Sequence, residues 1–194
     1  MIKQDVIEFF DRLAPDWDAE MIRDDEIIRT ILDNAGVKEG VSVLDVACGT
    51  GVLIPDYQKC GVSMVTGVDI SPNMIAIARE KFPQPNVRFL CSDIEEAAFE
   101  TPFDCIVVYN AFPHFPDPAK LIGVLAHDLR TGGTLTVAHG MSRAKIDHRH
   151  EGSARKVSAG LMHEDALEML FKPYFDVTVK ISDDRMYQVV GVKR

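Results

Sequence analysis

The stretch Val43-Leu44-Asp45-Val46-Ala47-Cys48-Gly49-Thr50-Gly51 reads VLDVACGTG and joins an apolar run, a carboxylate and a glycine turn. Glycine turns after buried strands often hold nucleotides, because a backbone without side chains can approach the ligand closely. An acid at the entrance of such a turn is unusual, since a carboxylate repels a phosphate. The stretch therefore predicts a nucleotide site in an α/β protein, with a ligand that is not held by phosphates.

Outward from this turn, short apolar runs alternate with amphipathic segments. Runs so short and β-branched are typical of strands buried on both faces of a parallel sheet. Strands are expected at 41–46, 62–68, 87–90, 103–109, 134–139, 174–181 and 186–193. Helices are expected at 4–13, around 27–32, and at 71–81, 117–129 and 163–172. The pattern predicts an α/β fold with a doubly wound, mostly parallel seven-stranded sheet, a C-terminal antiparallel hairpin and an N-terminal helical lid.

The length of 194 residues predicts one domain over residues 1–194. Residues 1–35 are expected to form the helical lid, and the long irregular region 140–162 a loop on the substrate side. No apolar run approaches the roughly 20 residues that span a membrane, and no secretory signal opens the chain, so a cytoplasmic location is expected. The net charge of −9 argues against nucleic-acid binding. Four scattered cysteines predict reduced thiols rather than disulfides or a zinc site.

The glycine turn matches neither of the common phosphate-binding motifs. A dinucleotide fingerprint needs a third glycine where Ile54 stands, and a phosphate-binding P-loop needs a Gly-Lys-Ser/Thr ending that is absent here. Asp45 also argues against a pyrophosphate. A phosphate-bearing ligand is therefore the weaker candidate for this turn.

At this point the sequence resembles the class I methyltransferases that use S-adenosylmethionine (SAM). Their first motif, D/E-x-G-x-G-x-G, is matched by DVACGTG at residues 45–51, with Ala47 in place of the first glycine. The methyl group of Ala47 is expected to be tolerated if its φ angle is negative. The resemblance explains the acid, because SAM carries an ammonium and a sulfonium group, and a carboxylate near that cationic end is favourable.

Three further matches follow in order, each at the end of an expected strand. In Gly67-Val68-Asp69-Ile70 the acid would accept hydrogen bonds from ribose hydroxyls, and in Cys91-Ser92-Asp93-Ile94 the acid would accept from the adenine amino group. Residues 103–111 resemble the strand beside the methyl donor. The resemblance implies a cofactor site of Asp45, Ala47, Cys48, Gly49, Gly51, Asp69, Ile70, Met74, Ser92, Asp93, Ile94 and Asn110. Each acid taken alone is equally typical of a helix cap or a turn.

The substrate side of the sequence favours a small molecule. The segment after the fourth strand, YNAFPHF at 109–115, lacks the Asn/Asp-Pro-Pro-Tyr/Phe and Pro-Cys signatures of nucleic-acid methyltransferases. Residues 9–18, FFDRLAPDWD, resemble the opening of quinone-biosynthesis methyltransferases, which implies a segment that folds over the substrate. Phe10, Trp17 and Phe115 are therefore candidate substrate contacts. An ordinary amphipathic helix that covers the sheet explains the same N-terminal pattern.

The histidines are the least generic feature of the chain. His114 is the first candidate for a catalytic base that deprotonates or orients the acceptor. A second hypothesis has His139, His148 and His150 binding a divalent metal that holds the substrate. The nearby basic residues suggest an anionic substrate, although a solvated basic loop has the same composition: Arg143, Arg149, Arg155 and Lys156.

The sequence thus predicts a SAM-dependent methyltransferase that acts on a small-molecule acceptor. Two alternatives stay open at this point. One is a SAM-binding or metal-binding protein without transfer activity, and the other is a nicotinamide-dependent oxidoreductase. The sequence does not fix the acceptor atom, and it is compatible with a homodimer.

Overall fold

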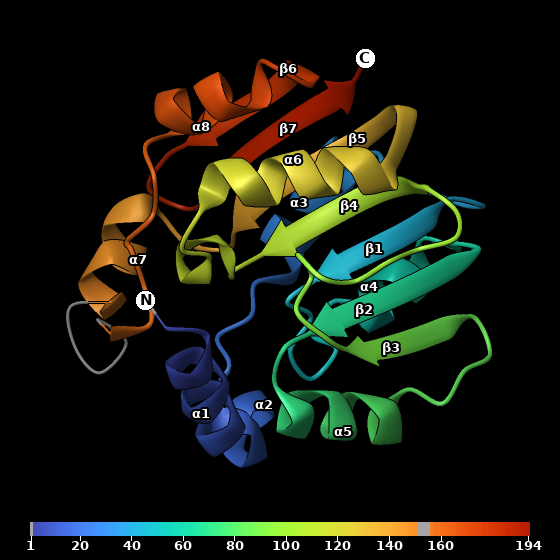
Figure 1. Cartoon of the computed structure of the whole chain (residues 1–194), viewed down its shortest axis with the longest axis vertical. Helices are drawn as coiled ribbons and strands as arrows, with labels where there is room; N and C mark the ends of the chain where they lie inside the picture. Colours follow the sequence, from blue (N-terminus) through green and yellow to red (C-terminus); the bar gives the residue numbers. More distant parts are fainter. Residues whose placement is uncertain (1, 151–155) are drawn as a thin grey trace.

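The computed structural model describes residues 2–150 and 156–194, except for the side chains of residues 149 and 150. Within this part of the chain, seven strands form one sheet in the order β3-β2-β1-β4-β5-β7-β6 (Figure 1). β1 to β5 run parallel, β7 is antiparallel to β5, and β6 is antiparallel to β7. The strands are β1 (Ser42–Val46), β2 (Met64–Asp69), β3 (Val87–Cys91), β4 (Phe103–Tyr109), β5 (Leu129–His139), β6 (Phe175–Ser182) and β7 (Tyr187–Lys193). The predicted fold class is confirmed.

Helices cover both faces of the sheet. The longer ones are α1 (Lys3–Leu13), α3 (Asp25–Asn34), α5 (Pro72–Lys81), α6 (Pro118–Asp128), α7 (Arg143–His150) and α8 (Glu164–Phe171). The shorter ones are η1 (Ala14–Asp16), α2 (Trp17–Glu20), α4 (Ile54–Lys59) and η2 (Phe112–His114). Three of them begin where a side-chain oxygen accepts a backbone N–H in the first turn: Asp24, Ser71 and Asp117. Such caps satisfy N–H groups that have no partner within the helix.

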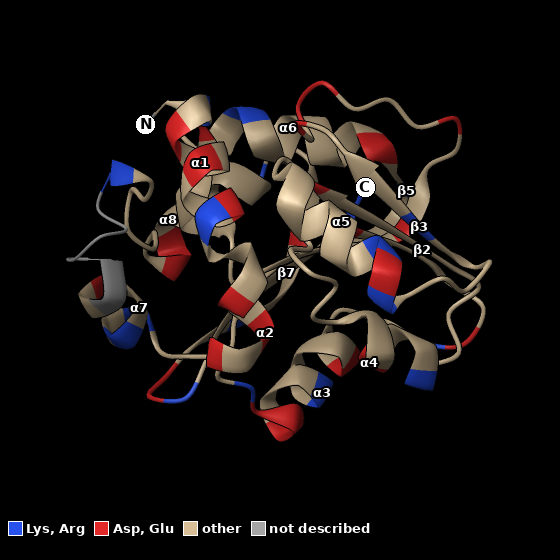
Figure 2. Cartoon of the chain, turned by 90° about the horizontal axis from the view of Figure 1, so that it is seen from below, with Lys and Arg blue, Asp and Glu red and all other residues tan. Residues whose placement is uncertain are grey.

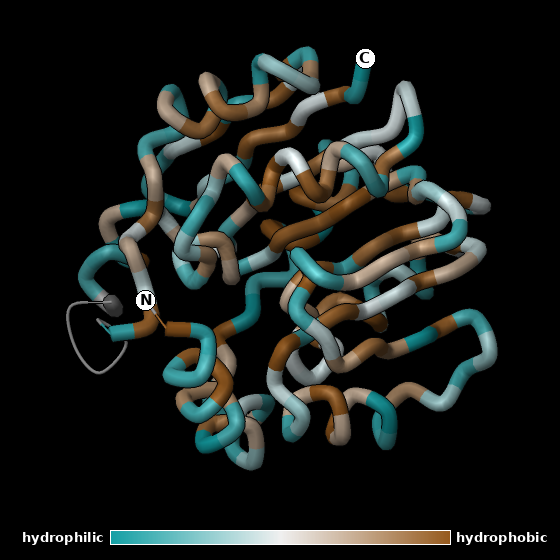
Figure 3. The backbone as a smooth tube through the Cα atoms, viewed as in Figure 1, coloured by the Kyte–Doolittle hydropathy of each residue, from teal (hydrophilic) through white to brown (hydrophobic). Residues whose placement is uncertain are grey.

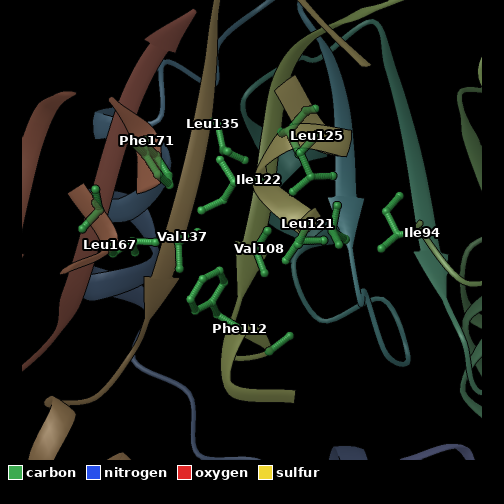
Figure 4. Close-up of a cluster of buried hydrophobic side chains, with 14 of the residues drawn as sticks. Ile94, Val108, Phe112, Leu121, Ile122, Leu125, Leu135, Val137, Leu167 and Phe171 are labelled. Atoms are coloured by element: carbon green, nitrogen blue, oxygen red, sulfur yellow. The ribbon is translucent and has the colours of Figure 1, made fainter. Parts of the chain in front are cut away.

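The core consists of two apolar layers, because successive side chains of a strand point to opposite faces of the sheet. On β1, Leu44 and Val46 join the layer under α6 and α8, which Figure 4 shows in close-up. Val43, between them, joins the layer under α3 and α4. Figure 3 shows hydrophobic positions following the strands and hydrophilic ones following the loops. Burial of both faces explains why these strands read as continuous apolar runs.

The end of the sheet where the parallel strands terminate is covered by separate segments. Figure 1 shows α1, α2 and α7 beyond the carboxyl ends of the parallel strands, and Figure 2 shows α1 and α2 beside α5. Acidic and basic positions are interspersed on the face seen in Figure 2. In open α/β sheets this end of the sheet is where ligands bind.

The structure corrects two of the expected elements. Residues 143–150, expected to be irregular, form α7; among its residues with described side chains only Ile146 is buried, so it lacks an apolar stripe. β5 begins at Leu129 rather than 134 and runs through Gly132-Gly133, a pair that is typical of turns. A Cβ atom on Gly133 would lie 2.8 Å from the Asp104 carbonyl oxygen. Glycine therefore permits a close approach of two strands there, next to a register shift in the β4–β5 pairing.

Candidate active site

A single cavity lies at the carboxyl ends of β1, β2, β3 and β4, beneath α1 and α2. All of the predicted cofactor residues except Gly51 line it, and so do His114, Phe10, Trp17 and Phe115. The structure therefore brings together residues that are separated by as much as a hundred positions in the sequence.

The turn after β1 adopts a left-handed backbone at alternate positions. Ala47 has φ +55°, Gly49 has φ +55° and Gly51 has φ +83°. The condition under which the methyl group of Ala47 was expected to be tolerated, a negative φ, is therefore not met. Ala47 and Asn110 are the only residues other than glycine with positive φ in the described part of the chain, and both line the cavity. Such strain costs of order 1–2 kcal/mol and concentrates at functional sites.

Gly51 has a structural role instead of a cavity-lining one. A Cβ atom there would lie 2.8 Å from the Phe82 ring and 3.1 Å from an Ile54 carbon. The glycine lets α4 start directly under the turn, with Phe82 packed against it. The motif glycine is thus explained by packing, while Ala47, Cys48 and Gly49 form the wall of the cavity.

Asp45 is buried, with 2% of its surface exposed, at the last but one position of β1. The pKa of Asp45 is raised to about 8. Burial is the largest cause and the charge of Asp69 adds to it, while a hydrogen bond with the Tyr57 hydroxyl opposes the rise. A cation that entered the cavity would reverse this effect by stabilising the carboxylate. Asp45 is therefore suited to a cationic ligand group.

Asp69, at the end of β2, holds the glycine turn in place. Its carboxylate accepts the backbone N–H of Gly49 at 2.8 Å and that of Ser71 at 2.9 Å. Burial raises the pKa of Asp69, and these backbone donors oppose the rise. Each carboxylate oxygen can accept a second hydrogen bond, so Asp69 can also receive hydroxyl groups of a ligand in the cavity.

Asp93, after β3, connects the cavity to the N-terminal helix. One of its oxygens accepts the backbone N–H of Glu95 at 2.9 Å, and the other forms an ion pair with Lys3 of α1. The neighbouring Glu95 is paired with Lys120 at 2.6 Å. Asp45, Asp69 and Asp93 thus lie at the carboxyl ends of three neighbouring strands and line one cavity.

Asn110, after β4, lines the cavity and is held in place by its neighbours. Its side-chain oxygen accepts the backbone N–H of Gly140 at 3.0 Å, and its amide hydrogen-bonds the hydroxyl of Tyr109. Burial raises the pKa of Tyr109, which Asn110 opposes. Tyr109 lines the cavity but was not among the predicted site residues, because in the sequence it reads as the last apolar position of a buried strand.

His114 in η2 has one ring nitrogen committed to the neighbouring loop. Its Nδ1 lies 2.7 Å from the carbonyl oxygen of Val157. Because a carbonyl can only accept, Nδ1 carries the proton, and in a neutral ring Nε2 is then the basic nitrogen. The N–H of Ala159 also donates to the Pro113 carbonyl at 2.8 Å. The described part of 140–162 contributes no cavity-lining residue and instead fixes the ring of His114.

Aromatic rings from the N-terminal segment cover the cavity. The ring of Phe10 meets His114 edge to face at 5.0 Å between centroids, and it meets Trp17 at 5.8 Å. A Cβ atom on Gly49 would lie 3.7 Å from the Trp17 ring nitrogen, so the indole stands beside the turn after β1. The three predicted substrate contacts lie in the same cavity as the predicted base.

Polar contacts fasten this N-terminal segment to the strand ends. Asp11 accepts from the Ser71 hydroxyl and from the N–H of Asn73 at 3.0 Å. Asp18 accepts from the Thr50 hydroxyl at 2.6 Å and pairs with Lys81. Together with Lys3 on Asp93, these contacts reach the turn after each of β1, β2 and β3. Lys3 and Met21 of this segment also line the cavity and were not predicted, since only docking brings them there.

The described residues give no support to the metal hypothesis. His139 is 1% exposed and packs beside Tyr187, while His148 lines a separate surface depression that includes Met141 and Arg185. The side chain of His150 lies outside the described residues. Among the described residues, no group of three or more His, Cys, Asp or Glu side chains could hold a metal ion. His139 was expected at the site because it ends a neighbouring strand, yet its side chain is enclosed beside Tyr187.

The described basic residues of the same segment do not line the cavity either. Arg143 and Lys156 are not among its lining residues. Arg155 and the side chain of Arg149 lie outside the described residues. The predicted attraction of an anionic substrate therefore has no support from the described cavity wall.

Residues 43–133 match the family model of a methyltransferase domain. The malonyl-[acyl-carrier protein] O-methyltransferase of Acetivibrio thermocellus is 31% identical over 81% of this chain and 58% of that protein. The ubiquinone biosynthesis O-methyltransferase of Coxiella burnetii is 32% identical over 69% of this chain and 60% of that protein. The chain thus spans less than two thirds of the length of these curated relatives.

The fold has solved counterparts. The magnesium protoporphyrin IX methyltransferase of Synechocystis, solved with bound S-adenosylhomocysteine (SAH), superposes with a TM-score of 0.74 over 99% of both chains, at 16% identity. At that identity the likeness concerns the fold.

In the described part of the chain, every helix falls short of the length or the apolar content needed to cross a membrane.

Proposed function

We propose that this chain, whose residues 43–133 match the family model of a methyltransferase domain, is a class I, SAM-dependent methyltransferase that transfers the methyl group of SAM to a small-molecule acceptor. The observation that carries the proposal is the convergence of Asp45, Asp69 and Asp93 on one cavity. Three carboxylates around a left-handed turn are unsuited to a pyrophosphate, and they are suited to a ligand with an ammonium group, a ribose and an adenine.

The described residues fit this cofactor on their own chemistry. Asp45 is a buried carboxylate whose raised pKa a cationic group would lower again. Asp69 has acceptor capacity left for ribose hydroxyls, and Asp93 for the adenine amino group. The turn at Ala47–Gly49 leaves the backbone exposed to the cavity. Asn110 supports the wall at the end of β4 rather than acting as an isolated polar contact.

Bound SAM supplies an activated methyl group: the acceptor's lone pair bonds to it as the carbon–sulfur bond breaks, and sulfur keeps that electron pair. The chain's own task is to align the acceptor and to remove its proton. We assign proton removal to Nε2 of His114, whose tautomer is fixed by the Val157 carbonyl. The aromatic side chains of the N-terminal segment exclude water from the reacting groups.

We propose oxygen as the acceptor atom. Both curated relatives described above are named O-methyltransferases, and a neutral hydroxyl needs the base that His114 provides. The acceptors named for those relatives belong to longer proteins, and neither is carried over to this chain.

We further propose one functional unit over residues 1–194, with residues 1–35 as the lid and 140–162 as the support of His114. All described strands belong to one sheet, which favours a single domain. A cytoplasmic location is favoured by the four cysteines, none of which forms a disulfide.

The proposal is tested by incubating the purified chain with SAM and a panel of hydroxyl-bearing small molecules and measuring SAH by mass spectrometry. We expect SAH to form in proportion to a methylated product with at least one acceptor. A parallel titration with NADH is expected to show no saturable binding. Binding of NADH without binding of SAH would favour an oxidoreductase instead.

Replacing His114 tests its assignment as the base. His114→Gln keeps a polar side chain of similar size but cannot take a proton. We expect kcat to fall about 10²- to 10⁴-fold. The affinity for SAH, measured by calorimetry, should change less than twofold. An unchanged kcat would remove His114 from the mechanism.

A further inference from the structure

We infer that the acceptor is a planar, apolar molecule that carries no charge when it binds. This inference rests on the proposed function, because it concerns cavity-lining residues that are not assigned to the cofactor. We call six of these the acceptor wall: Phe10, Trp17, Met21, Tyr109, His114 and Phe115.

The described residues that line the cavity include four acids and one lysine: Asp45, Asp69, Asp93, Glu95 and Lys3. Lys3, the only cationic side chain other than histidine among them, is paired with Asp93 and Glu96. Glu95 is paired with Lys120. The described wall therefore presents no unpaired lysine or arginine to an anionic acceptor.

The arrangement of the aromatic rings in the acceptor wall favours a flat molecule. The rings of Trp17, Phe10 and His114 follow one another with centroid separations of 5.8 and 5.0 Å and interplanar angles of 74° and 84°. Rings in such an arrangement present both faces and edges to a guest, and aromatic contacts favour another ring in offset or edge-to-face geometry. Met21 adds an adaptable apolar side chain to the same wall.

The physical consequence is discrimination by charge. An anion placed against these side chains would lose its hydration without gaining a cationic partner, whereas a neutral ring loses little. The basic residues that suggested an anionic substrate in the sequence do not line the cavity where they are described. Discrimination against an anion therefore follows from the wall itself.

Two probes of the same size test this inference: 2-naphthol, which is neutral at pH 7, and 2-naphthoate, which is anionic. Each is titrated by calorimetry into the full chain, with and without saturating SAH. We expect 2-naphthol to bind at least tenfold more tightly than 2-naphthoate. Equal affinity, tighter binding of the anion, or no binding of 2-naphthol would overturn the inference.

A pair of neighbouring substitutions provides the matched test. Met21→Lys places a cation on the cavity wall, and Ile22→Lys places the same cation outside it, on a side chain that is 63% exposed. We expect Met21→Lys to tighten 2-naphthoate binding at least fivefold and Ile22→Lys to leave it unchanged. Equal effects of both would show that the wall does not decide the charge preference.

The outcomes separate this inference from the proposed function. If SAH does not bind, the proposed function fails, and the comparison of the two probes on the ligand-free chain still decides the inference. If SAH binds and the probes show no preference for the neutral molecule, only the inference fails. Should Met21→Lys not fold, Phe10→Leu replaces it, with 2-naphthol expected to bind at least threefold more weakly.

Discussion

The buried carboxyl group of Asp45 makes the stability of the protein depend on pH. Its pKa is raised from 3.8 to about 8, so the folded chain holds a proton there that the unfolded chain releases near pH 4. A raised pKa contributes stability below the unfolded value, and this contribution is lost as the pH rises through the folded value. The ligand-free protein should therefore lose stability at this position between about pH 4 and pH 8.

The substitution Asp45→Asn removes that titration. We expect the variant to match the wild type near pH 4 and to be more stable, by at least about 1 kcal/mol, at pH 8.5. Urea unfolding of ligand-free protein at both pH values measures the difference. The exposed Asp16→Asn is the control, and it keeps Asp45, so its stability should follow the wild type at both pH values. Parallel pH profiles of wild type and Asp45→Asn would contradict the burial argument.

Two glycines allow backbone strain to be separated from packing. Gly40 and Gly51 share a φ of +83°, but a Cβ on Gly40 meets nothing within 4 Å, whereas one on Gly51 would lie 2.8 Å from the Phe82 ring. Gly40→Ala should lower the free energy of unfolding by about 1–2 kcal/mol through its left-handed backbone. Gly51→Ala should lose roughly 1–3 kcal/mol more through overpacking. Urea unfolding measures both free energies of unfolding. Equal losses in the two variants would show that the Phe82 ring moves aside without an energetic cost.

At the scale of elements, the N-terminal segment is attached to the cavity by few polar contacts. Asp11 carries two of them, to Ser71 and Asn73. Asp11→Asn should weaken charge-assisted hydrogen bonds worth about 1.5–3 kcal/mol in the intact protein. Backbone amides of α1 should then exchange with solvent roughly tenfold faster, and SAH should dissociate faster.

The control for this prediction lies in the same segment. Asp16→Asn removes an equal charge from an exposed side chain of η1 and should leave both rates unchanged. Hydrogen exchange followed by mass spectrometry and stopped-flow displacement of SAH supply the measurements. If the two variants behave alike, Asp11 does not hold the segment over the cavity.

The elements also show which parts of the fold the sequence can predict. α5 was predicted almost to the residue, because Ser71 caps it, Pro72 fits its first turn and apolar positions follow at helical spacing. α7 was missed, since Ile146 is the one buried residue among its described side chains and leaves no apolar periodicity to detect. The start of β5 was missed because Gly132-Gly133 is typical of a turn, whereas close contact with Asp104 is the actual reason for the second glycine.

At the scale of the whole molecule, the carboxyl ends of parallel strands meet by rule, so the convergence of Asp45, Asp69 and Asp93 was predictable. The same rule failed for the side chain of His139. Successive side chains of a strand point to opposite faces of the sheet, so the position of a residue at the end of a strand does not by itself tell which way its side chain points. Lys3 and Met21 line the cavity only because the N-terminal segment packs against it, and Tyr109 lines it because of its position at the end of β4. No local pattern in the sequence predicts that these residues line the cavity.

The most direct test of the account is a calorimetric titration of the full chain with SAH at neutral pH. The account predicts saturable binding at one site per chain. It also predicts that Asp69→Ala, which removes the acceptor that holds the turn, weakens this binding at least a hundredfold without unfolding the chain. Absence of binding to a folded wild-type chain at millimolar SAH, or full affinity in Asp69→Ala, would contradict it.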